Sequence, residues 1–249
     1  MKCKTVQASA FKASFEVLKD ILNDTNVVFD EKGIRLLTLD TARAALVDFH
    51  LKSENFEEYK CPEGEIVIAG LNISNAFKLL KSITNNDILE LEILNHEYLS
   101  ICIINTVKSS ITTFRLKLLD IDEDHIELPE IELSAQTILP SVDFQRICRD
   151  MFNISQEIVI TRTAEHLKFS CEGDFASQET TLDCSEQPVN VNLSGTYSLK
   201  YLNLFTRATS MCSSVQLMME KDMRFLVLKY NVASLGELNF YLATKVNEY

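Results

Sequence analysis

The sequence predicts an α+β fold made of two similar halves, in which helices cover antiparallel sheets. Three observations carry this prediction: apolar and polar residues alternate along most of the 249 residues, four short segments have helical periodicity, and an acidic connector lies near the middle. With 46% hydrophobic residues, the chain has enough apolar side chains to form a folded core.

Alternation with a period of two indicates strands that bury one face. It is clearest in segments 89–93, 167–171 and 189–193, where apolar residues occupy every second position. Strands with one buried and one solvated face are typical of antiparallel sheets. We therefore expect a strand-rich, largely antiparallel structure.

Four segments switch instead to a helical period. They lie near residues 9–23, 72–83, 141–152 and 197–208. The residues expected to cap them are Ser9, Asn72, Ser141 and Thr196. The apolar stripe of the first segment is Phe11, Phe15, Leu18 and Leu22, and that of the third is Phe144, Ile147, Cys148 and Met151. Each helix is therefore expected to cover one face of a sheet.

A connector separates the two halves of the chain. The segment 120–130 is acidic, lacks both periodicities and contains Pro129, one of only four prolines. Two helical segments lie on each side of it. We therefore predict an N-terminal domain over 1–116, an interdomain connector over 117–134 and a C-terminal domain over 135–249.

The net charge of −12 argues at first against binding to nucleic acid, because phosphates repel an acidic protein. Each helical segment nevertheless carries two basic residues at same-face spacing, turned away from the apolar stripe. These residues are Lys12 and Lys19, Lys78 and Lys81, Arg146 and Arg149, and Lys200 and Arg207. On one helix this is ordinary solvated charge. Its repetition on all four favours a basic surface that contacts the DNA backbone without reading its sequence.

Motifs typical of enzymes, metal sites and membrane proteins are absent from the sequence. The four histidines have no metal-ligand spacing to one another or to a cysteine, and the six glycines form no phosphate-binding loop. We expect no catalytic residue, no metal and no cofactor, and hence no enzyme, although a site assembled only in space would escape this test. The short apolar runs and the polar N-terminus predict neither a membrane span nor secretion.

Five segments, in order along the chain, carry a resemblance to a known family. They are FEEYKC (56–61), KLLDID (117–122), FQRICRD (144–150), SLKYLNLFTRAT (198–209) and ASLGELNFYLA (233–243). Together they resemble proliferating cell nuclear antigen, the eukaryotic-type DNA sliding clamp, and the similarity extends from end to end.

This resemblance implies a DNA clamp fold with two helices in each domain, assembled as a homotrimeric ring around duplex DNA. It implies a processivity factor and docking platform for DNA polymerase and other replication and repair enzymes, placed on DNA by a clamp loader. The eight basic helix residues would then line the inner wall. The expected location is the nucleus, or a cytoplasmic replication site if the protein is viral.

The resemblance also implies a pocket for PIP-box-like peptides, which carry a glutamine followed by aliphatic and paired aromatic residues. The residues expected to form it are Leu39, Arg43, Ala44, Leu46, Ile126, Leu128, Tyr241, Ala243 and Thr244. Two features depart from the family pattern: Thr244 replaces a proline, and the stretch 222–225 is one residue longer and has Arg224 in place of a proline. Ala164 occupies the usual position of the ubiquitin-accepting lysine, so that regulation is not carried over.

The resemblance also implies a subunit interface where strands 109–117 and 175–183 of neighbouring subunits meet. Such pairing joins two exposed sheet edges in a head-to-tail contact that can close into a ring. The residues predicted to lie there are Phe114, Leu116, Thr180 and Leu182.

Two alternatives remain open at the level of the sequence. The chain could be one subunit of a heterotrimeric checkpoint-type or variant clamp, which a solution mass would distinguish from a homotrimer. It could also be a monomeric polymerase accessory or scaffold protein that never encloses DNA.

Overall fold

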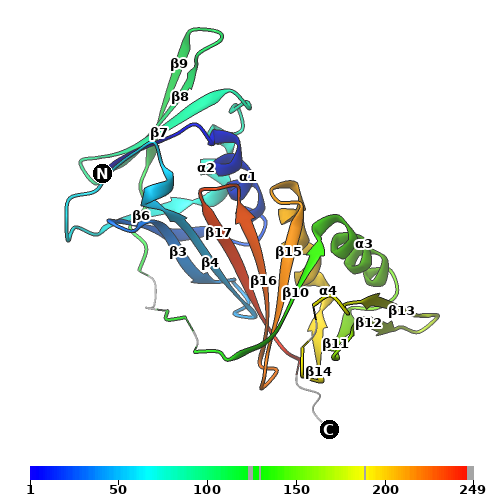
Figure 1. The fold of residues 1–249 in the computed structure, drawn as a ribbon. Coiled ribbons are helices and arrows are strands. Elements are labelled where there is room, and N and C mark those ends of the chain that lie inside the picture. The colour runs from blue at the N-terminus through cyan, green and yellow to red at the C-terminus, as the bar shows by residue number, and fades with distance from the viewer. Residues whose placement is uncertain (123–125, 129, 188, 246–249) are drawn as a thin grey trace. The chain divides into compact units, whose positions relative to one another are not determined.

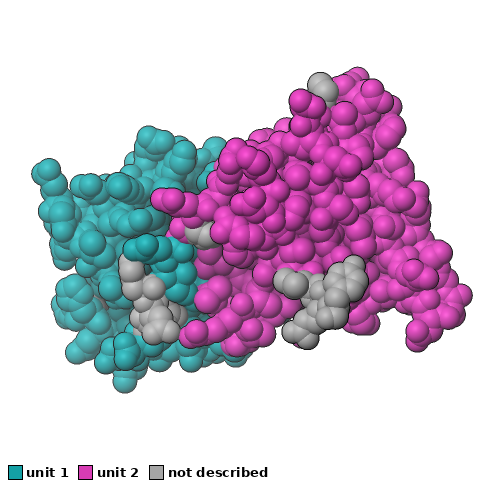
Figure 2. Space-filling view, turned by 90° about the horizontal axis from the view of Figure 1, so that it is seen from below, with its two compact units in different colours: residues 1–38, 47–127, 231–238 teal, residues 39–46, 128–230, 239–249 magenta. Residues whose placement is uncertain are grey.

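The computed structural model describes residues 1–122, 126–128, 130–187 and 189–245. Pro129, one of the features that define the predicted connector, lies outside these residues. The chain divides into two compact units, coloured separately in Figure 2. Unit 1 comprises residues 1–38, 47–127 and 231–238, and unit 2 comprises residues 39–46, 128–230 and 239–249.

All four predicted helices are present in the described chain (Figure 1). They are α1 (Ala8–Leu18), α2 (Ile73–Leu80), α3 (Ser141–Phe152) and α4 (Leu199–Phe205), with 3-10 turns η1 (Ser53–Asn55) and η2 (Thr206–Ser210). Of the predicted caps, only Asn72 is confirmed: its side chain accepts a hydrogen bond from the Asn75 N–H at 2.9 Å. Ser9 and Ser141 lie inside helices, and Thr196 belongs to the strand before α4. These three caps were therefore wrong.

Antiparallel strands make up most of the rest of the chain. Those that begin in unit 1 are β1 (Lys2–Thr5), β2 (Asp24–Asp30), β3 (Gly33–Leu39), β5 (Glu58–Lys60), β6 (Val67–Asn72), β7 (Asp87–Leu94), β8 (Tyr98–Asn105), β9 (Ser110–Lys117) and β17 (Gly236–Ala243). Those that begin in unit 2 are β4 (Ala45–Lys52), β10 (Leu133–Pro140), β11 (Glu157–Arg162), β12 (His166–Glu172), β13 (Ser177–Asp183), β14 (Leu193–Ser198), β15 (Ser214–Glu220) and β16 (Phe225–Val232).

The strand pairing within each unit confirms the predicted antiparallel sheets. Unit 1 contains a five-stranded sheet in the order β5-β1-β7-β8-β9, and β2 pairs with both β3 and β6. Unit 2 contains a four-stranded sheet in the order β13-β12-β11-β14, and β15 pairs with both β10 and β16.

Two of the three alternating segments form strands as predicted, and the third does not. Segments 89–93 and 167–171 lie inside β7 and β12. Residues 189–192 are not in a strand, and β14 begins only at Leu193. The ladder between β11 and β14 ends where Leu193 pairs with Arg162, so the residues before Leu193 have no partner strand there.

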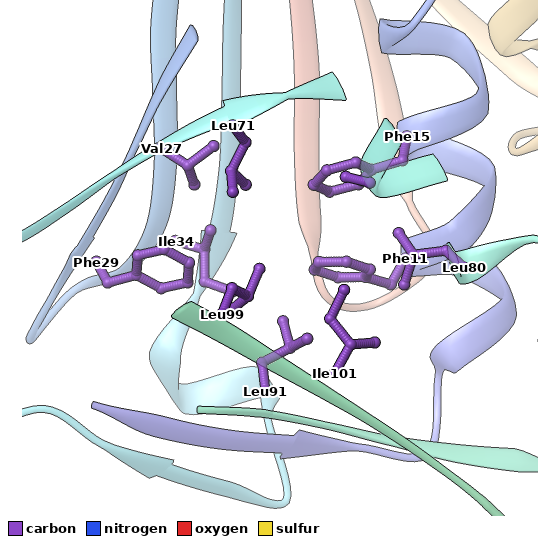
Figure 3. A pocket seen from close by; sticks show the side chains of 11 residues that line it. Phe11, Phe15, Val27, Phe29, Ile34, Leu71, Leu80, Leu91, Leu99 and Ile101 are labelled. Carbon is purple, nitrogen blue, oxygen red and sulfur yellow. The ribbon is translucent and has the colours of Figure 1, made fainter. Parts of the chain in front are cut away.

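The core of unit 1 is apolar and close-packed. The predicted stripe of α1 is buried, and the rings of Phe11 and Phe15 stack with centroids 4.9 Å apart. These rings face apolar side chains of β2, β3, β6, β7 and β8 across a cavity of about 10 Å³ (Figure 3). A space of this size is at the lower limit for one water molecule. It is therefore a small packing gap and not a ligand site.

The core of unit 2 is built in the same way from α3 and α4. The predicted stripe of α3 is fully buried, and Phe144 packs against Phe169 of β12. From α4, Phe205 stacks on Phe240 with centroids 4.4 Å apart. Both helices therefore cover sheet surface with their apolar faces, as the sequence predicts.

The first residues of the predicted connector lie along β6. The N–H of Leu119 donates to the carbonyl of Gly70 at 2.8 Å, and the amide of Asn26 donates to the carbonyl of Ile121 at 3.0 Å. Gly70 is required here because a Cβ at this position would lie 2.2 Å from the Leu119 carbonyl oxygen. The boundaries 1–116, 117–134 and 135–249 stay a prediction.

Substituting Gly70→Ala is expected to push the connector away from β6. The added methyl group cannot fit without moving backbone, so we expect the free energy of unfolding to fall by about 1–3 kcal/mol. Hydrogen exchange at the Leu119 N–H should accelerate in parallel. Ile68→Ala, an exposed change on the same strand, should alter neither quantity by as much. Equal exchange rates in the wild type and Gly70→Ala would contradict this packing.

None of the described helices has the length and apolar character that a membrane crossing requires. Among the same residues, no cluster of three or more His, Cys, Asp or Glu side chains is arranged to hold a metal ion.

Candidate functional site

In unit 1 the four predicted basic residues lie on α1 and α2 or at their C-terminal ends, and these two helices pack against each other. Lys12 and Lys19 are half-buried and linked to the second helix segment. The Lys12 ammonium donates to the carbonyl of Ile83 at 2.6 Å, and that of Lys19 lies 5.2 Å from the ring centroid of Phe77. Both lysines therefore also hold the helix pair together.

The other two predicted basic residues of unit 1, Lys78 and Lys81, are exposed. Lys78 lies in the last turn of α2, where its ammonium donates to the Asn75 side chain at 3.0 Å. Lys81 follows directly as the C-terminal cap residue of the helix. Positive charge at a helix C-terminus also interacts favourably with the helix dipole. Lys78 and Lys81 thus form the accessible positive charge of this helix pair.

In unit 2 all four predicted basic residues are exposed on α3, α4 and η2. Hydrogen bonds tie these elements together: the Asn203 amide donates to the Cys148 carbonyl at 3.2 Å, and the Gln145 amide to the Thr206 carbonyl at 2.9 Å. The four residues are Arg146, Arg149, Lys200 and Arg207.

Acidic neighbours reduce this positive charge only slightly. Arg146 lies 3.3 Å from Asp143, and Arg149 lies 3.7 Å from Asp150. Ion pairs between such exposed groups contribute about 0–1 kcal/mol and exchange readily with solvent. The guanidinium groups remain able to contact an external anion such as a phosphate.

A second candidate surface includes the loop that connects β3 and β4. The Asp40 carboxylate organises this loop by accepting hydrogen bonds from the backbone N–H groups of Ala42, Ala44 and Ala45 at 2.7–3.0 Å. The hydroxyl of Tyr201 in α4 donates to the same carboxylate at 2.6 Å. Asp40 thereby fixes the backbone that carries the predicted pocket residues Arg43 and Ala44.

The protonation states of Asp40 and Tyr201 suit this hydrogen bond. Burial tends to raise the pKa of Asp40, but the hydrogen bonds from Tyr201 and from the backbone outweigh it and lower this pKa below its ordinary value. Burial and the neighbouring carboxylate raise the pKa of Tyr201 to about 12. At neutral pH, Asp40 is ionised and Tyr201 is a hydrogen-bond donor.

Replacing Asp40 by Asn is expected to destabilise the fold in a pH-dependent way. Loss of the charged acceptor should cost about 1–3 kcal/mol at pH 7. Because the folded pKa lies below the unfolded one of about 3.9, the carboxylate stabilises the fold above that pH. This contribution is lost as the pH falls through the folded pKa, so the variant and the wild type should converge there. Urea unfolding at several pH values measures this. A pH-independent difference, or an equal loss in the exposed Asp222→Asn control, would contradict it.

The C-terminal part of the predicted pocket contacts the turn between β15 and β16. The N–H of Thr244 donates to the Arg224 carbonyl at 2.9 Å, and its hydroxyl donates to the Met223 carbonyl. The Arg224 guanidinium binds the buried carboxylate of Glu220 and donates to the Glu130 carbonyl at 3.2 Å. The two departures from the family pattern are therefore linked, since a proline at 244 could not donate either hydrogen bond.

The remaining predicted pocket residues differ in exposure. Leu128 is 47% exposed, whereas Leu46 is only 7% exposed and belongs to the core. Ile126, Leu39, Tyr241 and Thr244 are half-buried, and Ala243 is exposed. The N–H of Ala243 donates to the Ala44 carbonyl at 3.4 Å, which brings these two residues together.

The two strands predicted to form the subunit interface both lie at the edge of a sheet. In the described part of the chain, β9 pairs only with β8 and β13 pairs only with β12. Phe114, Leu116, Thr180 and Leu182 are half-buried and alternate with exposed neighbours. Both edges thus present unpaired backbone and a partly apolar row of side chains.

Two family models cover almost the entire chain. Residues 1–126 match the N-terminal domain of proliferating cell nuclear antigen, and residues 127–245 match the C-terminal domain of the same protein. The chain belongs to the proliferating cell nuclear antigen family. A relative from Paramecium bursaria Chlorella virus 1, named "Probable DNA polymerase sliding clamp 1", is 37% identical over 251 residues, covering 96% of this chain and 95% of the relative.

Family membership confirms several predictions made from the sequence. The family, the two-domain α+β clamp fold and the function of a DNA sliding clamp are those expected. The family consists of non-catalytic processivity factors. These proteins act at sites of DNA replication. The individual site residues stay predictions.

The sequence reasoning missed two residues that support the candidate surfaces. Asp40 has a local signal, because an aspartate followed by small residues often accepts hydrogen bonds from its own loop. Tyr201 has none, because it lies 161 positions after Asp40 and meets it only in the folded chain. Gly70 was seen only as one of six glycines, and its role depends on the connector passing over it.

Proposed function

We propose that this chain is the subunit of a homotrimeric ring that encircles duplex DNA and keeps a DNA polymerase bound to it. The observation that supports this most strongly is the pair of packed helices in each unit, with apolar faces buried and lysines or arginines exposed. In a chain of net charge −12, positive charge on all four helices is a specific feature.

In this proposal the basic helix residues face the DNA backbone. They are Lys12, Lys19, Lys78, Lys81, Arg146, Arg149, Lys200 and Arg207. Six of them are exposed and make the main contacts with phosphates. Lys12 and Lys19 are half-buried and contribute mainly to the positive electrostatic potential of the surface. Contacts with phosphates carry no sequence information, which suits a protein that slides.

The mechanism is topological tethering. A closed ring leaves DNA only by opening or by reaching an end, so each contact with the backbone can be weak and screened by salt. Weak contacts allow fast sliding. The processivity of a bound polymerase then comes from the closed ring and not from high affinity for DNA.

Partner enzymes dock through PIP-box-like peptides on the surface predicted to include Leu39, Arg43, Ala44, Leu46, Ile126, Leu128, Tyr241, Ala243 and Thr244. Of these, Leu46 is buried and belongs to the core beneath that surface. Leu128 supports this, since a leucine that is 47% exposed in an acidic segment gains most by being covered. A clamp loader is included among the partners because a closed ring must be opened to admit duplex DNA. The nucleus, or a cytoplasmic replication site for a viral protein, is the proposed location.

The subunit contact joins β9 of one copy to β13 of the next, with Phe114 and Leu116 facing Thr180 and Leu182. Solution mass tests the assembly directly. Multi-angle light scattering of the pure protein should give three times the chain mass of 28.3 kDa. A monomer mass at all accessible concentrations would contradict the ring and would favour the monomeric scaffold. A trimer formed only after adding a second, different clamp chain would favour the heterotrimeric alternative.

A further inference from the structure

The two edge strands carry opposite charge. From residue 105 to 117, the turn before β9 and β9 itself contain three basic residues, Lys108, Arg115 and Lys117, and no acidic one. From residue 172 to 186, the last residue of β12, strand β13 and the turns that flank β13 contain no basic residue. The five acidic residues there are Glu172, Asp174, Glu179, Asp183 and Glu186.

All eight of these charged side chains are exposed, and on the strands they form a row of their own. On β9, Arg115 and Lys117 alternate with the half-buried Phe114 and Leu116. On β13, Glu179 and Asp183 lie on the face opposite to the half-buried Thr180 and Leu182. Because side chains alternate along a strand, each edge presents one partly apolar row and one charged row on opposite faces.

Contacts within the chain leave this charge largely intact. Glu179 lies 2.5 Å from the ammonium of Lys168 in the neighbouring β12, and Asp183 accepts a hydrogen bond from the Ser185 N–H at 2.8 Å. Counting Lys168, the acidic edge still has five carboxylates against one cation. Strand β8, the neighbour of β9, carries no charged residue at all.

We propose that these charges select which edges pair, so that β9 of one copy joins β13 of the next and neither edge joins its own kind. This inference rests on the proposed ring and adds to it a charge rule that decides which strand edges join the subunits. An open edge can pair with any other open edge, so unpaired strands need a device that excludes wrong partners.

The rule follows from the three possible pairings. Joining β9 to β9, or β13 to β13, gives a two-fold symmetric dimer that opposes like charges. Joining β9 to β13 opposes unlike charges. When the partly apolar rows share one face, the period of two also places Arg115 and Lys117 on the same face as Glu179 and Asp183. Like charges that are brought together at an interface suppress association, and unlike charges speed it.

Three variants test the rule. The first reverses the basic row of β9 (Arg115→Glu with Lys117→Glu), the second reverses the acidic row of β13 (Glu179→Lys with Asp183→Lys), and the third carries all four changes. Analytical ultracentrifugation should show that each single-edge reversal raises the dissociation constant of self-association by about 100-fold or more. The four-fold exchange should return it to within about tenfold of wild type, because the charged rows on β9 and β13 themselves are again of opposite sign.

A control variant separates the edges from net charge. Lys32→Glu with Lys221→Glu changes two exposed lysines in turns and shifts the net charge as much as the first variant does. It should associate like the wild type. The four-fold exchange, mixed with tagged wild type, should form rings only with itself, since mixed contacts would oppose like charges. Circular dichroism establishes that each variant is folded.

The outcomes distinguish this rule from the ring itself. If the wild type is a trimer and single-edge reversals of folded protein associate as tightly, the charge rule is wrong and the ring stands. Free mixing of the four-fold exchange with wild type would overturn the rule in the same way. A wild type that stays monomeric would overturn both.

Discussion

Reversing Lys78 and Arg149 together to glutamate is expected to shorten the DNA synthesised per binding event by about tenfold or more, with the oligomer intact. Both side chains are exposed, one on the helix pair of each unit. A unit charge 4 Å from a phosphate contributes about 1 kcal/mol in water, and reversal replaces attraction with repulsion. In a symmetric ring, every copy carries both changes. Primer extension with excess unlabelled trap DNA measures the product length.

A matched control makes this prediction specific. Lys32→Glu with Lys221→Glu also removes two exposed lysines, one from each unit, but from turns between strands and not from helices. It should leave processivity within about twofold of wild type. Undiminished processivity in the Lys78 and Arg149 variant, or an equal loss in the control, would remove the helix pairs from the proposed DNA surface.

Truncating Ile126 and Leu128 to alanine is expected to weaken binding of a partner peptide by about 2 kcal/mol or more, which is about 30-fold in affinity. Apolar side chains that become buried on binding supply most of the affinity of such contacts. Calorimetry with a synthetic peptide containing a glutamine, an aliphatic residue and two adjacent aromatic residues measures the effect.

The control for the peptide site removes similar apolar surface from the same predicted connector, 117–134. Leu119→Ala with Leu133→Ala changes two leucines that are 41% and 45% exposed but are not among the proposed pocket residues. The peptide should bind this variant as it binds the wild type. Unchanged affinity in the Ile126 and Leu128 variant would exclude those two residues from the site.

The sequence predicted the elements that depend on local pattern. All four helices and two of the three alternating segments were predicted correctly from periodicity, because burial of one face imposes a period of 3.6 or of two. The predicted strands 109–117 and 175–183 correspond closely to β9 and β13, and both are sheet edges. Helix caps were predicted less well. Thr196 pairs with β11 as part of strand β14, and Ser141 lies inside helix α3.

Features that depend on distant partners could not be predicted. Arg162 is completely buried, although arginine is usually exposed, and its Nε donates to the Thr137 hydroxyl at 3.0 Å. Helical spacing predicted that Lys12 and Lys19 would face solvent, yet both are half-buried because they contact the neighbouring helix segment. A period identifies a face, but the neighbouring element decides how exposed that face is.

Retention on circular and linear DNA tests the central claim most directly. After loading onto a nicked circular plasmid, the labelled protein is separated from free protein by gel filtration, before and after a single cut by a restriction enzyme. A ring that encircles DNA should stay with the closed circle through a high-salt wash and should be lost once the circle is cut. Equal retention on both forms, or loss from the closed circle in salt, would show that contacts and not encirclement hold the protein on DNA.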